Sequence, residues 1–144
     1  QKGCALSGSN EPRRSVGIGK EPYMAEKKKI LICDDEVGIR ESLNLILHEA
    51  YDLSFCTNGK ECFQALAQKQ TFDLLLLDIK MPVASGLDIL RKIKQKNPRQ
   101  RAIIITGYKS VETAQEAIKA GALDYIVKPF SSKEILSSVA RNLA

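Results

Sequence analysis

Residues 72–82, Phe-Asp-Leu-Leu-Leu-Leu-Asp-Ile-Lys-Met-Pro, decide the fold class of this chain. The apolar run 74–77 is too short to cross a membrane and too continuous for a strand with one wet face. It therefore predicts a strand buried on both faces, as in a parallel sheet. Asp78 follows the last leucine, at the strand end where open α/β sheets bind their ligands.

On both sides of this strand the chain alternates between short apolar runs and segments of helical periodicity. Four more strands are expected near residues 29–33, 52–57, 102–105 and 123–127. The first helix is expected to bury Ile39, Leu43, Ile46, Leu47 and Ala50, and the second Cys62, Ala65 and Leu66. The third helix is expected over 86–96, with Leu87, Leu90 and Ile93 buried. The fourth is expected to begin with Ser110 as its N-cap and to bury Val111, Ala114, Ala117 and Ile118. The fifth is expected from about Ser132, with Ile135, Leu136, Val139 and Leu143 buried.

Five strand-then-helix units predict an α/β fold, a doubly wound parallel sheet with helices on both faces, although periodicity does not give the strand order. Residues 27–144 are expected to form this one domain. Residues 1–26 contain Gly, Ser, Asn and Pro without a hydrophobic period, which predicts a disordered leader or a cloning remnant ahead of Met24.

The distribution of charge and the cysteine content exclude several classes of function. Residues 1–29 carry a net charge of +4 and residues 30–144 only +1, so we expect the domain to make no direct contact with nucleic acid. There is no membrane-spanning run and no signal peptide. Four cysteines without C-x-x-C spacing, with His48 as the only histidine, argue against a zinc site or a disulfide framework and favour a reducing cytoplasm.

Polar side chains stand at the carboxyl ends of four expected strands. They are Asp34 and Asp35, Asp78, Thr106 and Lys128, whereas the second strand ends in Thr57-Asn58 and offers nothing comparable. If the four strands are neighbours, these side chains meet in one crevice. A site built from the first, third, fourth and fifth strands, without the second, fits a sheet in which the chain reverses direction between its first and third strands.

The chemistry of this set indicates phosphoryl transfer. Three clustered carboxylates need a cation, and hard oxygen donors without His or Cys select magnesium or a similar ion. A magnesium-bound aspartate beside a lysine and a hydroxyl is typical of a site where the carboxylate is the nucleophile. The expected product is an aspartyl phosphate on Asp78.

The motifs Asp34-Asp35, 78–82, Thr106-Gly107 and Lys128-Pro129-Phe130, in this order at matching strand ends, resemble the receiver domain of bacterial two-component response regulators. The resemblance covers about residues 27–144. It implies a three-layer (βα)5 flavodoxin-like fold with strand order 2-1-3-4-5.

The resemblance also implies roles for individual residues. Asp78 is the phosphoacceptor and a ligand of Mg2+, with Mn2+ as the alternative ion. Asp35 is a direct metal ligand, Asp34 acts through water, and the backbone carbonyl of Lys80 completes the protein's set of ligands.

A second group of residues is implied to read the phosphoryl group. Thr106 and Lys128 contact it, the bond from Lys128 to Pro129 is cis, and Tyr125 is the switch aromatic that moves from exposed to buried. The surface of the fourth helix, fifth strand and fifth helix changes in response. The domain is then a phosphoacceptor that assists its own phosphorylation and dephosphorylation, and not an enzyme.

The implied partners are a sensor histidine kinase or phosphotransfer protein, a second copy in a phosphorylation-dependent homodimer, and a C-terminal effector domain absent from this chain. Residues 110–114 and 120–125 look similar to receivers of enhancer-binding transcriptional activators. Glu36 is expected to complement the dipole of the helix that follows it, and His48 to be exposed.

Three other functions were considered, and for each one a feature of the sequence argues against it. A hydrolase of the haloacid dehalogenase type needs a second acid where this chain has Lys80. A dinucleotide-binding domain needs a glycine-rich loop where the chain has Asp34 and Asp35. A pseudo-receiver binds partners without phosphorylation, and the full acid set argues against it.

Overall fold

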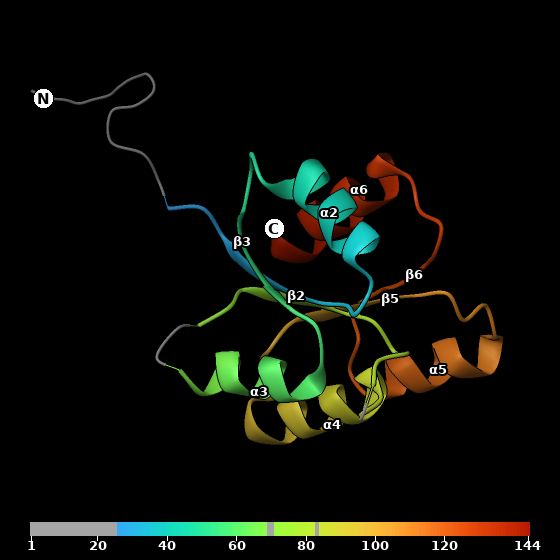
Figure 1. The fold of residues 1–144 in the computed structure, drawn as a ribbon. Helices are drawn as coiled ribbons and strands as arrows, with labels where there is room; N and C mark the ends of the chain where they lie inside the picture. Colours follow the sequence, from blue (N-terminus) through green and yellow to red (C-terminus); the bar gives the residue numbers. More distant parts are fainter. Residues whose placement is uncertain (1–25, 69–70, 83) are drawn as a thin grey trace, which may run out of the picture.

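The computed structural model describes residues 26–68, 71–82 and 84–144. Its five parallel strands form one sheet: β2 (Lys29–Cys33), β3 (Asp52–Cys56), β4 (Leu74–Leu77), β5 (Ala102–Thr106) and β6 (Tyr125–Val127). They lie in the order β3-β2-β4-β5-β6. This confirms the α/β class and the strand order 2-1-3-4-5 that the resemblance implies (Figure 1).

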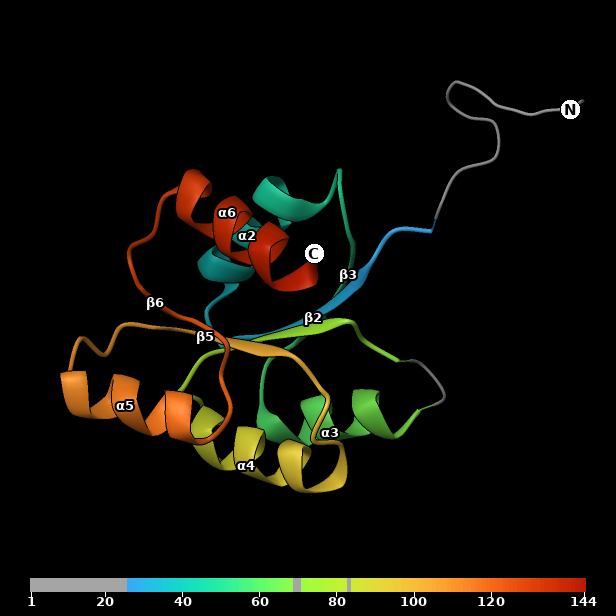
Figure 2. The ribbon, with the colours of Figure 1, turned by 180° about the vertical axis from the view of Figure 1, so that it is seen from behind.

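Helices cover both faces of the sheet. On one face lie α2 (Val37–Leu47) and α6 (Ser132–Leu143), and on the other α3 (Gly59–Ala67), α4 (Gly86–Lys96) and α5 (Val111–Lys119) (Figures 1 and 2). The sheet separates two apolar cores, one under each layer of helices. The three-layer arrangement is the one expected.

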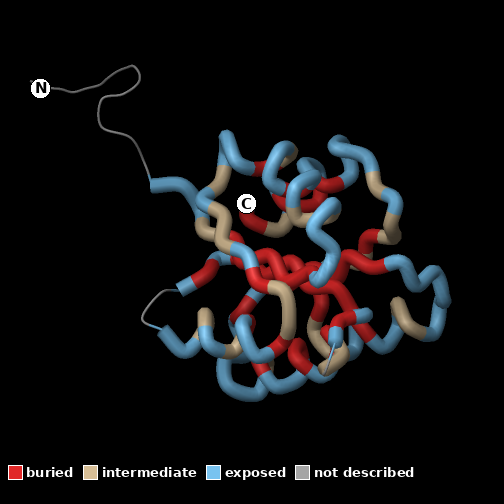
Figure 3. The backbone as a smooth tube through the Cα atoms, in the orientation of Figure 1, coloured by how far each residue is buried: buried red, intermediate tan, exposed pale blue. Residues whose placement is uncertain are grey.

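β4 is buried on both faces, as its leucine run predicts. Leu75 and Leu77 belong to the core under α3, α4 and α5, and Leu74 and Leu76 to the core under α2 and α6. This is the alternation of a strand whose side chains point to opposite faces. Figure 3 shows the buried sheet between exposed helix surfaces. Asp78 therefore leaves the sheet at its centre.

Four residues that were expected in the core are exposed: Val111 by 71%, Ile118 by 53%, Leu136 by 42%, and Ala50, which lies beyond the end of α2. In α5 only Ala117 is buried. Because an alanine lets a helix approach the sheet closely, α5 packs along this narrow row and the two larger side chains at its flanks face solvent. The apolar stripe was predicted too wide.

The expectation of unpaired cysteines is wrong for Cys33 and Cys56, which form a disulfide. The parallel pairing of β2 with β3 sets these two residues opposite each other. Register, which the spacing of cysteines in the sequence does not reveal, brings them together. Cys62 is a buried free thiol.

The predicted leader, residues 1–26, lies almost entirely outside the described residues, and its disorder stays a prediction. In the part of the chain that the structure describes, none of the helices has the length and apolar character needed to cross a membrane.

Candidate functional site

The carboxyl ends of β2, β4, β5 and β6 surround one hollow of about 380 Å³. We call it the acidic hollow; it is lined by Asp35, Glu36, Asp78, Lys80, Thr106, Gly107, Tyr108 and Lys128. Asp34 lies beneath it, buried, and reaches Lys128. The structure thus brings together the five strand-end side chains that the sequence singles out.

Lys128 is the centre of charge in this site. Its Nζ lies 2.9 Å from Asp34 Oδ2, 3.1 Å from Asp78 Oδ2 and 2.9 Å from Glu36 Oε1. Burial alone would lower the pKa of Lys128, but hydrogen bonds to Asp34 and Glu36 and the charges of Asp78 and Asp34 raise it above its usual value. The side chain is therefore a cation. It offsets the cost of two buried carboxylates, each of which would be strongly unfavourable alone.

The two buried acids are also fixed by backbone groups. Asp34 Oδ1 accepts a hydrogen bond from the N–H of Glu36 at 2.9 Å, and Asp78 Oδ1 accepts one from the N–H of Lys80 at 3.2 Å. Burial raises the pKa of Asp34, and the nearby charge of Asp78 raises it further, against the lowering effect of Lys128 and the Glu36 N–H. Each acid thus has one oxygen on a backbone N–H and the other on the lysine.

Asp34, Asp35 and Asp78 form a set that fits a divalent cation. Each offers a carboxylate oxygen, and these oxygens all lie within 4.8 Å of one another. Asp35 is the exposed member and opens to solvent, while the other two are buried. The donors are hard oxygens carrying three negative charges, which suits Mg2+ better than a soft metal.

Thr106 and Tyr125 are linked through the backbone of Tyr108. Thr106, at the end of β5, is fully buried, and its Oγ1 accepts from the N–H of Tyr108 at 3.5 Å. The hydroxyl of Tyr125 donates to the carbonyl of Tyr108 at 2.8 Å, which keeps this half-buried ring outside the acidic hollow. Burial, with a smaller contribution from the charge of Asp78, raises the pKa of Tyr125. The Lys128-Pro129 bond is cis, as the resemblance implies.

Two residues of the site were not identified from the sequence. Glu36 is the N-cap residue of α2, the expected place at the helix start, but its side chain makes no cap hydrogen bond and its carboxylate pairs with Lys128. The third consecutive acid in Asp34-Asp35-Glu36 was the available signal. Gly86 begins α4 directly against the backbone carbonyl of Asp78, where a Cβ atom would overlap it.

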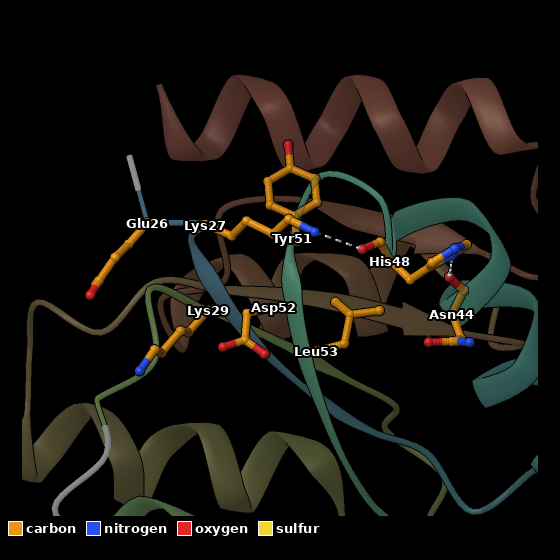
Figure 4. Close-up of a pocket in the computed structure, with 8 residues that line it drawn as sticks. All are labelled: Glu26, Lys27, Lys29, Asn44, His48, Tyr51, Asp52 and Leu53. Carbon is orange, nitrogen blue, oxygen red and sulfur yellow. Dashed lines mark hydrogen bonds between the residues drawn. The ribbon is translucent and has the colours of Figure 1, made fainter. Parts of the chain in front are cut away.

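A second hollow lies at the other end of the sheet, where β2 and β3 begin (Figure 4). There the ammonium of Lys27 reaches the carbonyl of His48 at 3.5 Å, and His48 Nδ1 lies 2.8 Å from the carbonyl of Asn44. His48 is exposed, as expected. This hollow contains none of the predicted site residues, so the acidic hollow is the candidate site.

Comparison with known proteins agrees with this geometry. Residues 30–140 match the protein family described as the response regulator receiver domain. Among curated proteins, the alginate biosynthesis transcriptional regulatory protein AlgB of Pseudomonas aeruginosa is 35% identical over 124 residues, which is 85% of this chain and 27% of AlgB. The response regulator protein PilR of the same species is 40% identical over 118 residues, 81% of this chain and 26% of PilR. The chain thus spans about a quarter of these relatives.

Solved structures give the same result. A crystal structure of a CheY-like response regulator receiver domain protein from Methanospirillum hungatei aligns with a TM-score of 0.76 and 34% sequence identity. The alignment covers 82% of this chain and 94% of that one. At this identity the similarity extends beyond the fold.

Proposed function

Since this chain belongs to the response regulator receiver domain family, we propose that it is a signalling switch activated by phosphorylation of Asp78. One observation carries the proposal. The carboxylate of Asp78 lines the acidic hollow, with one oxygen on a lysine cation, and two further carboxylates place an oxygen within 4.8 Å of its own, close enough for all three to hold one divalent ion. Such a carboxylate is equipped to accept a phosphoryl group and to hold it beside positive charge.

In the proposed reaction an oxygen of Asp78 attacks the phosphorus of an acyl or histidyl phosphate. The bond from phosphorus to the donor breaks, and its electron pair leaves with the donor. Lys128 turns its ammonium toward the transferred oxygens, and the hydroxyl of Thr106 donates to one of them. Asp35, Asp78, the carbonyl of Lys80 and, through water, Asp34 would hold Mg2+ or Mn2+, which neutralises charge on the phosphoryl oxygens.

The new group carries a charge of about −2, and it changes what Lys128 and Thr106 contact. When Thr106 moves toward the phosphoryl group, the loop that carries Tyr108 moves with it. Tyr125 then loses the carbonyl that keeps its ring outside, and it turns inward. A differential contact energy of a few kcal/mol is enough to shift a domain between two such populations. The surface of α5, β6 and α6 is the proposed output.

The proposed partners follow from this switch. A sensor histidine kinase or phosphotransfer protein supplies the phosphoryl group, and a phosphorylation-dependent homodimer or a C-terminal effector domain reads it. AlgB is named as a transcriptional regulatory protein and PilR as a response regulator protein, and this chain aligns to about a quarter of each. We propose that this receiver likewise controls an output domain of a transcriptional regulator.

The test is chemical phosphorylation of the purified chain. Incubation with acetyl phosphate and Mg2+ should add one phosphoryl group by intact mass, and Asp78→Asn should abolish the gain. Asp88→Asn, an exposed aspartate on α4, is the matched control and should label normally. Labelling that survives in Asp78→Asn would refute the assignment. No labelling of the wild type would indicate a pseudo-receiver, and repeated turnover of phosphate esters would indicate a hydrolase.

A further inference from the structure

A second group of reactive side chains lies apart from the acidic hollow. Cys33 and Cys56 end the neighbouring strands β2 and β3, and Cys62 projects onto them from α3. All three are buried, and their Sγ atoms lie within 4.8 Å of one another. We call these three residues the thiol cluster.

The surroundings of the thiol cluster are apolar. Its three side chains belong to the core under α3, α4 and α5, together with Leu31 and Leu77. His48, the only histidine in the sequence, is exposed on the far face of the sheet and offers no nitrogen donor. The donor set is therefore sulfur alone, which selects soft, thiophilic ions.

The number of sulfur donors and their burial restrict further which ligands the thiol cluster can bind. Structural zinc is bound almost always by four ligands, and this group of described residues supplies three. Desolvation raises the pKa of Cys62 to about 12, so the thiol resists ionisation and a pocket of three thiolates would be costly. A ligand that ends as a neutral complex with three sulfurs avoids this cost.

We propose that the reduced thiol cluster is a binding site for a thiophilic trivalent metalloid of the arsenic(III) class. Arsenous acid is neutral and forms three arsenic–sulfur bonds as three water molecules leave with the thiol protons, so the oxidation state of arsenic does not change. The Cys33–Cys56 disulfide must first be opened. A phosphine reduces the disulfide: the phosphorus takes the oxygen of one water molecule and becomes a phosphine oxide, and the two sulfur atoms take the hydrogens of that water and become thiols.

The site is independent of phosphorylation. The cysteine side chains lie in the core under α3, on the side away from the acidic hollow's carboxylates. Cys33 directly precedes Asp34 in the chain, and two backbone hydrogen bonds join the strand ends, from Asp78 N–H to Cys33 O at 3.0 Å and from Asp34 N–H to Cys56 O at 3.1 Å, but no cysteine side chain takes part in these links. Binding should therefore persist in Asp78→Asn. That variant separates a failure of this proposal from a failure of the proposed function.

The test uses the full chain, reduced with a phosphine that is then removed, and arsenite as the probe. Native mass spectrometry should show a gain of one arsenic atom and a loss of three hydrogen atoms, and the thermal midpoint should rise, because a ligand bound to the native state stabilises it. Cys62→Ala and Cys56→Ala should weaken binding by at least about tenfold. Cys4→Ala should bind as the wild type does.

Three results would overturn the proposal. One is a wild-type chain whose mass and thermal midpoint do not change with arsenite. Another is undiminished binding by Cys62→Ala, which would leave only a two-thiol chelate. The third is an adduct lost in Cys4→Ala. If Cys62→Ala does not fold, Cys62→Ser replaces it and must lose the arsenite-dependent rise in the midpoint.

Discussion

Glu36 and Lys128, 92 residues apart in the sequence, form an ion pair of 2.9 Å at the mouth of the acidic hollow. The Lys128 side chain is 13% exposed and that of Glu36 is 60% exposed. The lysine is thus shared between two buried acids and one acid in contact with solvent. Glu36 is the partner that an incoming phosphoryl group can displace at the lowest cost.

We expect Glu36→Gln to accelerate phosphorylation of Asp78 by acetyl phosphate at saturating Mg2+. An exposed ion pair contributes about 0.2–1 kcal/mol, so the gain should lie between about 1.5-fold and fivefold. Initial rates by intact mass measure it. Glu41→Gln, which removes an exposed carboxylate from α2, is the control and should change nothing. An unchanged or slower rate in Glu36→Gln would show that the pair does not compete with the phosphoryl group.

Gly86→Ala should both destabilise the domain and slow phosphorylation. The added Cβ would overlap the backbone carbonyl of Asp78, and a backbone cannot move aside as a flexible side chain can. Overpacking of this kind costs about 1–3 kcal/mol, measurable by urea unfolding. Relief of the overlap would displace Asp78 from Lys128, so the rate should fall as well.

Gly38→Ala is the matched control for this prediction. Nothing lies within 4 Å of the position its Cβ would take, and Gly38 is within α2. Alanine favours the helix by up to about 1 kcal/mol, so this variant should be slightly more stable than the wild type. Equal unfolding free energies for the two glycine variants would contradict the close approach at Gly86.

The parts of the fold that depend on periodicity and on strand ends could be predicted. The run Leu74–Leu77 gives a doubly buried strand, and the predicted third helix, 86–96, has the observed bounds of α4. The five strand-end side chains meet because parallel strands end at a common edge. These features are set by short stretches of chain.

The features that were missed depend on which element packs beside which. Ile118 has helical spacing but lies at the flank of α5. Cys33 and Cys56 meet through the register of two strands, and Glu36 reaches Lys128 along the common carboxyl edge of the sheet, from the end of β2 to the end of β6. No local pattern encodes such pairings. The strand order likewise came from family resemblance.

Mg2+ affinity should separate the two adjacent acids. Asp34 already has one oxygen on Lys128 and the other on the Glu36 N–H, whereas Asp35 opens to solvent in the acidic hollow. Asp34→Asn should raise the Kd for Mg2+ by about tenfold, as loss of an outer-sphere group does, and Asp35→Asn should raise it more. Isothermal titration calorimetry measures both. A larger effect in Asp34→Asn would reverse the proposed roles.

Alkaline pH should destabilise the reduced domain through Cys62. Desolvation raises the pKa of this thiol from its ordinary value of 9.0 to about 12, so between these values the unfolded chain loses a proton that the folded chain keeps. The folded state then binds more protons, and the free energy of unfolding falls as pH rises through this window, by about 1 kcal/mol from roughly pH 8 to 10.

Cys62→Ala lacks this group, while Tyr125, whose pKa is also raised, is common to both proteins. In urea unfolding under reducing conditions, the stability of the wild type relative to Cys62→Ala should therefore decline with pH. A constant difference would show that the Cys62 thiol is open to water.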